Sequence, residues 1–174
     1  MSEILIRPAA AADIGAIARI YAHAVRFGTA SFEVEPPDAA EMARRRRALV
    51  EAGYPYLVAA IDGAVLGYAY AGAYRARPAY RWSVENSIYV APDAQRRGVG
   101  RALIDALIAE TERRGFRQMI AVIGDAAQTP SIALHRAAGF RLIGVLEAVG
   151  FKHDRWLDTV LMQRALGPGA TANP

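Results

Sequence analysis

The segment 82–114 restricts the fold of this chain most, because it joins a strand pattern to a helix pattern through a glycine turn. WSVENSIYV at 82–90 alternates as a strand does, and QRRGVG follows at 95–100. Apolar residues then recur at helical spacing over 99–114, and the pattern stops before Gly115. A strand, a glycine turn and an amphipathic helix in this order predict a mixed α/β (α+β) domain.

The rest of the chain supplies strands and helices at short intervals. Asp38 with Glu41 three residues later is typical of a helix start. This order predicts a single domain over 1–166, whereas GPGATANP at 167–174 has nothing to bury and is expected to be disordered. We expect strands at 3–8, 55–61, 64–74, 117–124, 140–150 and 155–166, and helices at 11–27, from Asp38 onward and at 130–138.

Composition excludes several classes of protein. Apolar residues make up 53% and charged residues 22% of 174, which is typical of one soluble globular domain. The absence of cysteine excludes disulfides, thiolate metal sites and a cysteine nucleophile. No apolar run approaches the roughly 18 residues of a membrane span, and the N-terminal segment lacks the features of a secretory signal. We therefore expect a soluble cytoplasmic protein, and no metal site, because the three histidines lack ligand spacing.

The glycine turn has the properties of an anion site. A helix N-terminus leaves backbone N–H groups without partners and carries a partial positive charge. Gly98 and Gly100 let an anion approach these groups, and Arg96, Arg97 and Arg101 add to a formal net charge of +4. The turn is not a Walker loop, because no Gly-Lys-Ser/Thr follows. A pyrophosphate cradle and an ordinary flexible turn with solvated arginines both fit these residues.

Four arginines at 44–47 raise the alternative of nucleic-acid binding. They circle the predicted helix instead of forming a stripe, and Glu41 and Glu51 flank them. Aromatic residues, which binders of single strands use as stacking platforms, are not interleaved with them. We interpret the run as a solvated helix face, and we expect neither a nucleic-acid nor a membrane partner.

QRRGVG between a strand and a helix resembles the acetyl-CoA motif of the GNAT acetyltransferase superfamily, Gln/Arg-x-x-Gly-x-Gly/Ala. Further segments, in order, are similar to the phosphinothricin N-acetyltransferase branch of that superfamily. They are IYAHAV, GTASFE, GYPYLVA, VENSIYV, SIALHRAAGF and KHDRWLD, and the resemblance covers roughly residues 3–165. It implies the GNAT fold, a mostly antiparallel sheet splayed at the acetyl-CoA site with helices on both faces. It also implies acetyl-CoA-dependent N-acetylation of a small amino acid such as phosphinothricin, methionine sulfoximine or methionine sulfone.

The resemblance further implies which residues hold acetyl-CoA. Backbone groups of Ile88–Val90 would hold the pantetheine arm, and N–H groups from Arg96 to Arg101 would bind the pyrophosphate. Gln128 stands where the branch often has an asparagine, three residues before the serine of its SIxLH motif; glutamine keeps the amide but lengthens its reach. The expected acetyl-CoA contacts are Ile88, Tyr89, Val90, Gln95, Arg96, Arg97, Gly98, Val99, Gly100, Arg101 and Gln128.

Acetyl transfer to an amine needs a base, because the amine of an amino acid is mostly protonated near neutral pH. Glu85 lies on the strand face shared with Ser87 and Tyr89, and the phosphinothricin branch carries a glutamate at this place. His135, on a helix that lies near the thioester in GNAT enzymes, is the second candidate, as base or as proton donor to the thiolate. A solvent-facing glutamate and a packed histidine are the structural alternatives. Direct attack of the amine on acetyl-CoA follows most simply, with the oxyanion held by a strand N–H at Tyr89 or Val90.

The substrate contacts are also implied by the resemblance. A substrate with a carboxylate and a phosphinate needs cations and hydrogen-bond donors, and the family uses the loop at 75–81 for its substrate. Acetylation of another amine (an antibiotic, a polyamine or a protein N-terminus) and non-catalytic binding of acyl-CoA are the alternatives. A homodimer is expected from the resemblance. The expected substrate contacts are Phe32, Glu33, Arg75, Ala76, Arg77 and Arg155.

Overall fold

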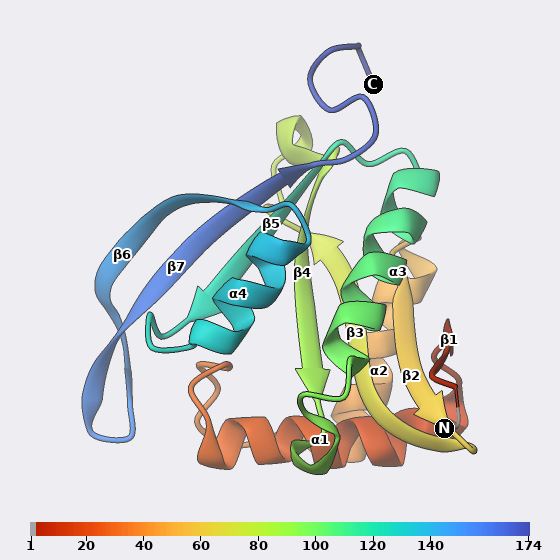
Figure 1. The fold of residues 1–174 in the computed structure, drawn as a ribbon, viewed down its shortest axis with the longest axis vertical. Coiled ribbons are helices and arrows are strands. Elements are labelled where there is room, and N and C mark those ends of the chain that lie inside the picture. The colour runs from red at the N-terminus through yellow and green to blue at the C-terminus, as the bar shows by residue number, and fades with distance from the viewer. Residues whose placement is uncertain (1–2) are drawn as a thin grey trace.

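A single open sheet organises residues 3–174, the part of the chain that this computed structural model describes (Figure 1). Its seven strands are β1 (Leu5–Pro8), β2 (Tyr56–Ile61), β3 (Ala64–Ala73), β4 (Ser83–Val90), β5 (Gln118–Gly124), β6 (Arg141–Lys152) and β7 (Arg155–Ala165). They lie in the order β1-β2-β3-β4-β5-β7-β6. Neighbouring strands are antiparallel except for β4 and β5, which are parallel.

Helices cover both faces of this sheet. The described residues form α1 (Ile14–Phe27), α2 (Ala39–Glu51), α3 (Val99–Arg113) and α4 (Thr129–Ala137), with short 3-10 turns at Ala11–Asp13, Pro78–Tyr80 and Pro92–Ala94. Side chains of α1 and α2 form one buried cluster with the sheet, and α3 and the end of α4 form another on the opposite face. The predicted fold, a mostly antiparallel mixed sheet between helices, is confirmed.

The element boundaries follow local hydrogen bonds. The Asp38 carboxylate accepts the Glu41 N–H at 2.8 Å and so caps α2 where the sequence predicts it. The first helix, predicted over 11–27, begins at Ile14, because the Asp13 side chain bonds to groups that precede the helix. Its carboxylate accepts the Ala10 N–H at 2.7 Å and pairs with Arg7 at 2.7 Å, so residues 11–13 form a 3-10 turn.

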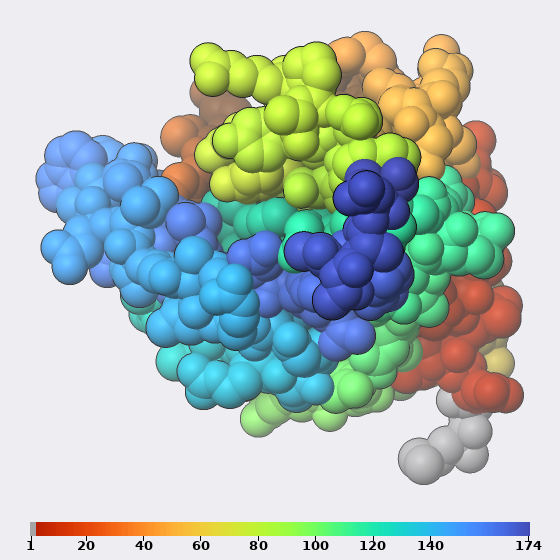
Figure 2. All heavy atoms as spheres, turned by 90° about the horizontal axis from the view of Figure 1, so that it is seen from above, coloured from red at the N-terminus to blue at the C-terminus, as the bar shows by residue number. Residues whose placement is uncertain are grey.

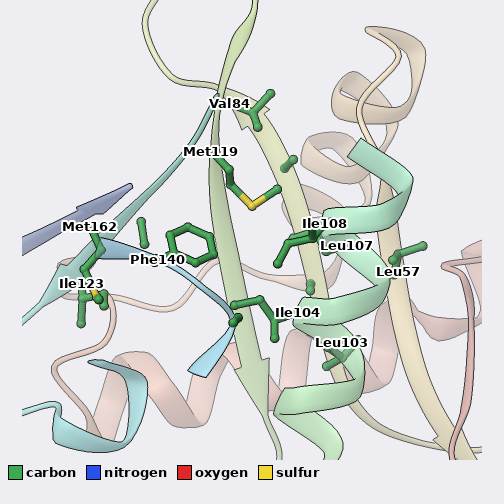
Figure 3. Close-up of a cluster of buried hydrophobic side chains, with 14 of the residues drawn as sticks. Leu57, Val84, Leu103, Ile104, Leu107, Ile108, Met119, Ile123, Phe140 and Met162 are labelled. Carbon is green, nitrogen blue, oxygen red and sulfur yellow. The ribbon is translucent and has the colours of Figure 1, made fainter. Parts of the chain in front are cut away.

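The larger core lies between α3 and the sheet (Figure 3). Leu103, Ile104 and Leu107 of α3 are fully buried and point toward the strands. Gly67 of β3 permits this close approach, because a Cβ there would lie 3.1 Å from Leu103 and 2.9 Å from the Tyr89 carbonyl. Tight packing of α3 fixes the direction in which its N-terminus points.

The parallel pair β4–β5 separates partway along its length. The two strands are paired from Ser83 with Gln118 to Asn86 with Ala121, and no further. Beyond Asn86, β4 continues beside β3, and beyond Ala121, β5 continues beside β7. The sheet is therefore splayed between residues 87–90 and 122–124, as the resemblance implies.

The C-terminal segment follows β7 as a set of turns. Within residues 167–174, the Gly169 N–H donates to the Leu166 carbonyl, and Arg117 donates to the Asn173 carbonyl at 3.0 Å. The disorder expected for this segment stays a prediction. None of the helices in residues 3–174 combines the length and the apolar character needed to cross a membrane.

Candidate active site

A small cavity of about 50 Å³ lies where β4 and β5 separate. Ser87–Tyr89 of β4 line one side and Ala121–Gly124 of β5 line the other. Ala30 of the loop after α1 also lines the cavity, and the rest of the lining is made by Asn86, Gln128, Ser131 and His135. The loop after α1, the strands β4 and β5 and the helix α4 therefore meet at the splay.

Backbone groups of β4 face this gap without a strand to pair with them. The Ala91 N–H donates to the Leu66 carbonyl beside β3, so the alternation of a strand turns the Tyr89 N–H toward β3 as well. The N–H groups of Ile88 and Val90 then point toward the gap. An extended chain that enters the gap could bond to them as an added strand does.

The glycine turn has a conformation that suits an anion. Gly98, the residue before α3, has a φ of 83°, in the left-handed region that favours glycine. A Cβ at Gly98 would meet no atom within 4 Å, so the space in front of the helix is open. Gln95, Arg96 and Arg97 are exposed there, and the first N–H groups of α3, from Val99 onward, have no carbonyl of a preceding turn to bond.

Gly100 and Arg101 lie at the start of α3 and contact α4 or its end. A Cβ on Gly100 would lie 3.4 Å from Leu134, so glycine allows the two helices to pack closely. The Arg101 guanidinium donates to Asp105 at 2.6 Å and to the Ala137 carbonyl at 3.2 Å. Its side chain is therefore engaged within the protein, and the backbone N–H is the group that Arg101 offers to an anion.

Glu85 lies half-buried on the sheet face covered by α1 and α2. Burial raises the pKa of its carboxyl above the ordinary value of 4.5, and the positive charge of Arg75 opposes this rise. A carboxylate that water solvates poorly binds a proton more readily than a free one does. Glu85 therefore has the basicity expected of a proton acceptor.

His135 is buried in α4 and packs edge-on against Phe140. Its Nδ1 lies 2.8 Å from the Ser131 carbonyl and its Nε2 lies 3.0 Å from the Asn86 side-chain oxygen. Burial lowers the pKa of the imidazole below 6.5, so it is neutral at neutral pH and carries one N–H. Both ring nitrogens face an oxygen that accepts, and a neutral ring donates to only one of them, so the tautomer decides which. The Asn86 amide nitrogen donates to the Ile120 carbonyl at 3.5 Å.

The two predicted catalytic residues do not meet. Glu85 and Asn86 are neighbours on β4 and point to opposite faces, and His135 lies on the Asn86 side. Each residue therefore approaches the splay from its own face of the sheet. Asn86, which the sequence analysis did not single out, is the residue that joins α4 to the splay.

The predicted substrate wall lies beside the end of β5. The Phe32 ring packs on Gly124 and Gly150, because a Cβ on either glycine would come within 2.7 Å of it. The Glu33 carboxylate accepts from Arg45 at 2.6 Å and from the Tyr21 hydroxyl at 3.0 Å. Phe32 and Glu33 are thus held between the sheet and the helices α1 and α2.

The sequence profile of the acetyltransferase (GNAT) family matches residues 17–140, a span that contains the splay, the glycine turn and His135. The chain belongs to this family. A phosphinothricin N-acetyltransferase of Alcaligenes faecalis is 56% identical over 93% of this chain and 82% of its own. An L-methionine sulfoximine/L-methionine sulfone acetyltransferase of Pseudomonas paraeruginosa is 40% identical over 96% of this chain and 97% of its own.

A solved structure from the same family matches the fold of the whole chain. It is a GNAT superfamily phosphinothricin acetyltransferase from Sinorhizobium meliloti in complex with acetyl-CoA. The two structures match with a TM-score of 0.96 at 51% identity, over 100% of this chain and 94% of the other. The GNAT fold expected from the sequence is therefore confirmed along the whole chain.

Two other predicted contacts of this GNAT acetyltransferase bond within the protein. The Gln128 amide, expected near acetyl-CoA, donates to the Thr29 hydroxyl at 2.9 Å. Arg155, expected at the substrate, donates to Asp125 at 2.7 Å. Thr29 and Asp125 are in turn bonded to each other at 2.9 Å. The sequence reasoning missed both, because only the fold brings Thr29 and Asp125 together.

The loop at 75–81 presents its predicted contacts to solvent. Arg75, Ala76 and Arg77 are all exposed, and the Arg75 guanidinium lies over the Tyr74 ring at 4.7 Å. Arg75 is also the charge that stabilises the ionised form of Glu85. Of these three residues, Arg75 is therefore the one whose positive charge acts on Glu85.

Three of the four arginines at 44–47 have hydrogen-bond partners within the protein. Arg44 and Arg45 bond to Glu41 of the same helix, Arg45 also bonds to Glu33, and Arg46 donates to the Ala9 carbonyl. The bond between Arg45 and Glu33 connects α2 to the loop that carries Glu33.

Proposed function

We propose that this GNAT acetyltransferase transfers the acetyl group of acetyl-CoA to the amine of a small amino acid such as L-phosphinothricin, methionine sulfoximine or methionine sulfone. The observation that carries the proposal is the half-buried Glu85 beside the unpaired end of β4. A proton acceptor of raised pKa at an open backbone edge suits the activation of an amine next to a bound acyl group. The similarity to the Alcaligenes faecalis and Pseudomonas paraeruginosa enzymes supports this class of substrate.

The residues of this chain fit acetyl-CoA as co-substrate. Ile88 and Val90 offer backbone N–H groups to the pantetheine arm along the gap. The open N-terminus of α3 at Gly98 offers N–H groups and positive charge to the pyrophosphate, with Arg96 and Arg97 beside it. Gln128 lines the cavity at the splay while its amide nitrogen donates to Thr29, so we propose that it contacts acetyl-CoA beside the backbone groups.

Glu85 is the proposed base. Its carboxylate takes a proton from the substrate ammonium, directly or through water, and the free amine attacks the acetyl carbonyl carbon. The carbon–sulfur bond then breaks, which leaves the amide product and a thiolate that takes up a proton. Of the two strand N–H groups first considered for the oxyanion, Val90 is favoured over Tyr89, because the Tyr89 N–H faces β3.

His135 contributes through Asn86 in this account. Both of its ring nitrogens already have partners within the protein, Nδ1 at the Ser131 carbonyl and Nε2 at the Asn86 side-chain oxygen. We therefore propose that His135 orients Asn86 at the point where β4 and β5 separate. Donation of a proton to the thiolate by His135 stays a prediction from the resemblance.

We propose that the anionic groups of the substrate lie between Phe32 and Glu33 on one side and Arg75, Ala76 and Arg77 on the other. Arg75 supports this arrangement, because it is exposed and its charge acts on Glu85. Arg155 acts on the substrate side through Asp125, to which it is already paired.

The homodimer expected from the resemblance is part of the proposal. The outer strand β6 and the start of β7 carry a row of exposed apolar side chains that a second copy of this chain would bury. The hairpin that they form projects from the body of the molecule (Figure 2). The exposed residues are Leu142, Ile143, Val145, Leu146, Val149, Phe151 and Trp156.

The other expected partners and the location stay predictions. We expect no nucleic-acid partner, because Arg44–Arg46 are bonded within the protein. We also expect no membrane partner, and we expect the cytoplasm as the location, on the sequence arguments alone.

The test is a steady-state panel that measures thiol release from acetyl-CoA with L-phosphinothricin, methionine sulfoximine, methionine sulfone, methionine, spermidine and an aminoglycoside. We expect the highest kcat/KM for the first three. Turnover of only spermidine or the aminoglycoside would move the activity to another amine. Binding of acetyl-CoA with no turnover of any amine would mean a non-catalytic acyl-CoA-binding protein.

A further inference from the structure

Asp125 is a buried carboxylate at the end of β5 that takes no part in the proposed proton transfer. We infer that it is a positioning residue, which fastens the loop 28–33 to the open end of the splay and so sets the affinity for the amino-acid substrate. This inference rests on the proposed function, because the loop carries Phe32 and Glu33.

The carboxylate of Asp125 joins the loop after α1 and the strand β7 to the end of β5. It accepts the Thr29 hydroxyl at 2.9 Å, the Arg155 guanidinium at 2.7 Å and the Ala127 N–H at 3.0 Å. Asp125 is 6% exposed and has a φ of 70°, in the left-handed region. Three hydrogen bonds to one buried carboxylate offset the energetic cost of a positive φ, which residues other than glycine seldom adopt.

The loop is fastened at a second point along its length. The buried Lys152 ammonium donates to the Ser31 carbonyl at 2.7 Å, and Gln128 donates to the Thr29 hydroxyl at 2.9 Å. The hydroxyl of Ser31 meets the Tyr21 hydroxyl at 2.9 Å on the α1 side. Thr29 and Ser31 are both buried by these contacts, so the loop enters the site along a fixed path.

The position of Phe32 depends on this path. Gly124 directly precedes Asp125, and a Cβ on Gly124 would lie 2.7 Å from both the Phe32 ring and the Thr29 carbonyl. The contact between Thr29 and Asp125 therefore holds the loop against the last residue of β5. Loss of that contact frees Phe32 to move relative to the gap, whereas the glycine turn at α3 shares no hydrogen bond with this cluster.

The test compares Asp125→Asn with the matched control Asp13→Asn. Asp13 is also 6% exposed, and it also pairs with an arginine and a backbone N–H, but it does so at Arg7 and Ala10, beside β1. For Asp125→Asn we expect the KM for L-phosphinothricin to rise about tenfold, which is the order expected for a weakened charge-assisted hydrogen bond. The Kd for acetyl-CoA and kcat should change little, and Asp13→Asn should leave KM unchanged.

Hydrogen exchange measured by mass spectrometry supplies a readout that needs no substrate. Asp125→Asn should speed exchange within residues 28–33 relative to the wild type and to Asp13→Asn. Unchanged exchange in this loop would overturn the inference, whatever happens to KM. Faster exchange with an unchanged KM would overturn the claim that the loop sets substrate affinity.

Thr29→Val keeps the shape of the side chain and removes the hydroxyl that Asp125 and Gln128 bond. If Thr29 and Asp125 act through one hydrogen bond, the double variant should raise KM by less than the two single effects combined, and the remaining excess over Asp125→Asn reports the lost Gln128 contact. Additive effects of the two substitutions would overturn that pathway. If the wild type acetylates no amino acid, the proposed function fails, while the exchange measurement still decides whether Asp125 fastens the loop.

Discussion

Single residues of this site are tuned by burial, which acts in opposite directions on Glu85 and His135. It raises the pKa of the carboxyl and lowers the pKa of the imidazole, since in each case it disfavours the charged form. The sequence alone singles out Glu85, Gly98 and His135. The structure places His135 at the splay cavity, Glu85 on β4 just before the strands separate, and Gly98 directly before α3, whereas their roles in catalysis and acetyl-CoA binding stay predictions.

His135 should make folding stability depend on pH. Its pKa is 6.5 in the unfolded chain and lower in the folded protein, so between these two values the unfolded chain binds more protons. The free energy of unfolding should therefore fall as pH drops below about 6.5, by about 1.4 kcal/mol for each unit between the two pKa values. Below the folded pKa this loss stops.

Urea unfolding of the wild type and of His135→Gln at pH 7.5 and 5.5 measures this effect. Glu85, whose raised pKa has the opposite effect on stability, is present in both proteins, so its contribution cancels when the two are compared. The difference in stability between the two pH values should be smaller in the variant. Equal differences would mean that His135 is protonated with the same pKa in both states.

In the proposed mechanism the glycine turn before α3 binds the pyrophosphate of acetyl-CoA, and the splay holds the reacting groups. Gly98→Val should raise the Kd for acetyl-CoA about tenfold, because the new side chain would protrude into the open space before α3 that the pyrophosphate is proposed to fill. Isothermal titration with acetyl-CoA measures this. Gly115→Val, at a φ of 86° beyond the other end of α3, carries the same strain without a proposed anion and should leave the Kd unchanged.

The elements were predictable because each is defined locally. The cap at Asp38, the periodicity of α3 and the alternation of β4 lie within a few residues of sequence. The contacts of Asn86 with His135, of Asp125 with Thr29 and of Arg45 with Glu33 were not predicted. Each joins residues that only the sheet order and the helix packing bring together, so no local pattern signals them.

At the scale of the whole molecule, the apolar face of β6 carries the prediction of a dimer. Leu146 is 48% exposed on this face, so replacing it should not disturb the monomer core. Light scattering coupled to size exclusion should give a dimer for the wild type and a monomer for Leu146→Glu, because a buried unpaired carboxylate opposes association. Val122→Glu, at an exposed apolar position on β5, is the matched control. A monomeric wild type would contradict the proposed dimer.

Glu85 is proposed to remove the proton from an amine beside acetyl-CoA, and the pH dependence of kcat/KM for L-phosphinothricin measures this proton transfer. The wild type should lose activity toward acid with an apparent pKa above 4.5, because the raised pKa of Glu85 leaves it protonated there. Glu85→Gln should lower kcat/KM at neutral pH by at least about 100-fold with an unchanged Kd for acetyl-CoA. A near wild-type rate for Glu85→Gln at neutral pH would contradict the account.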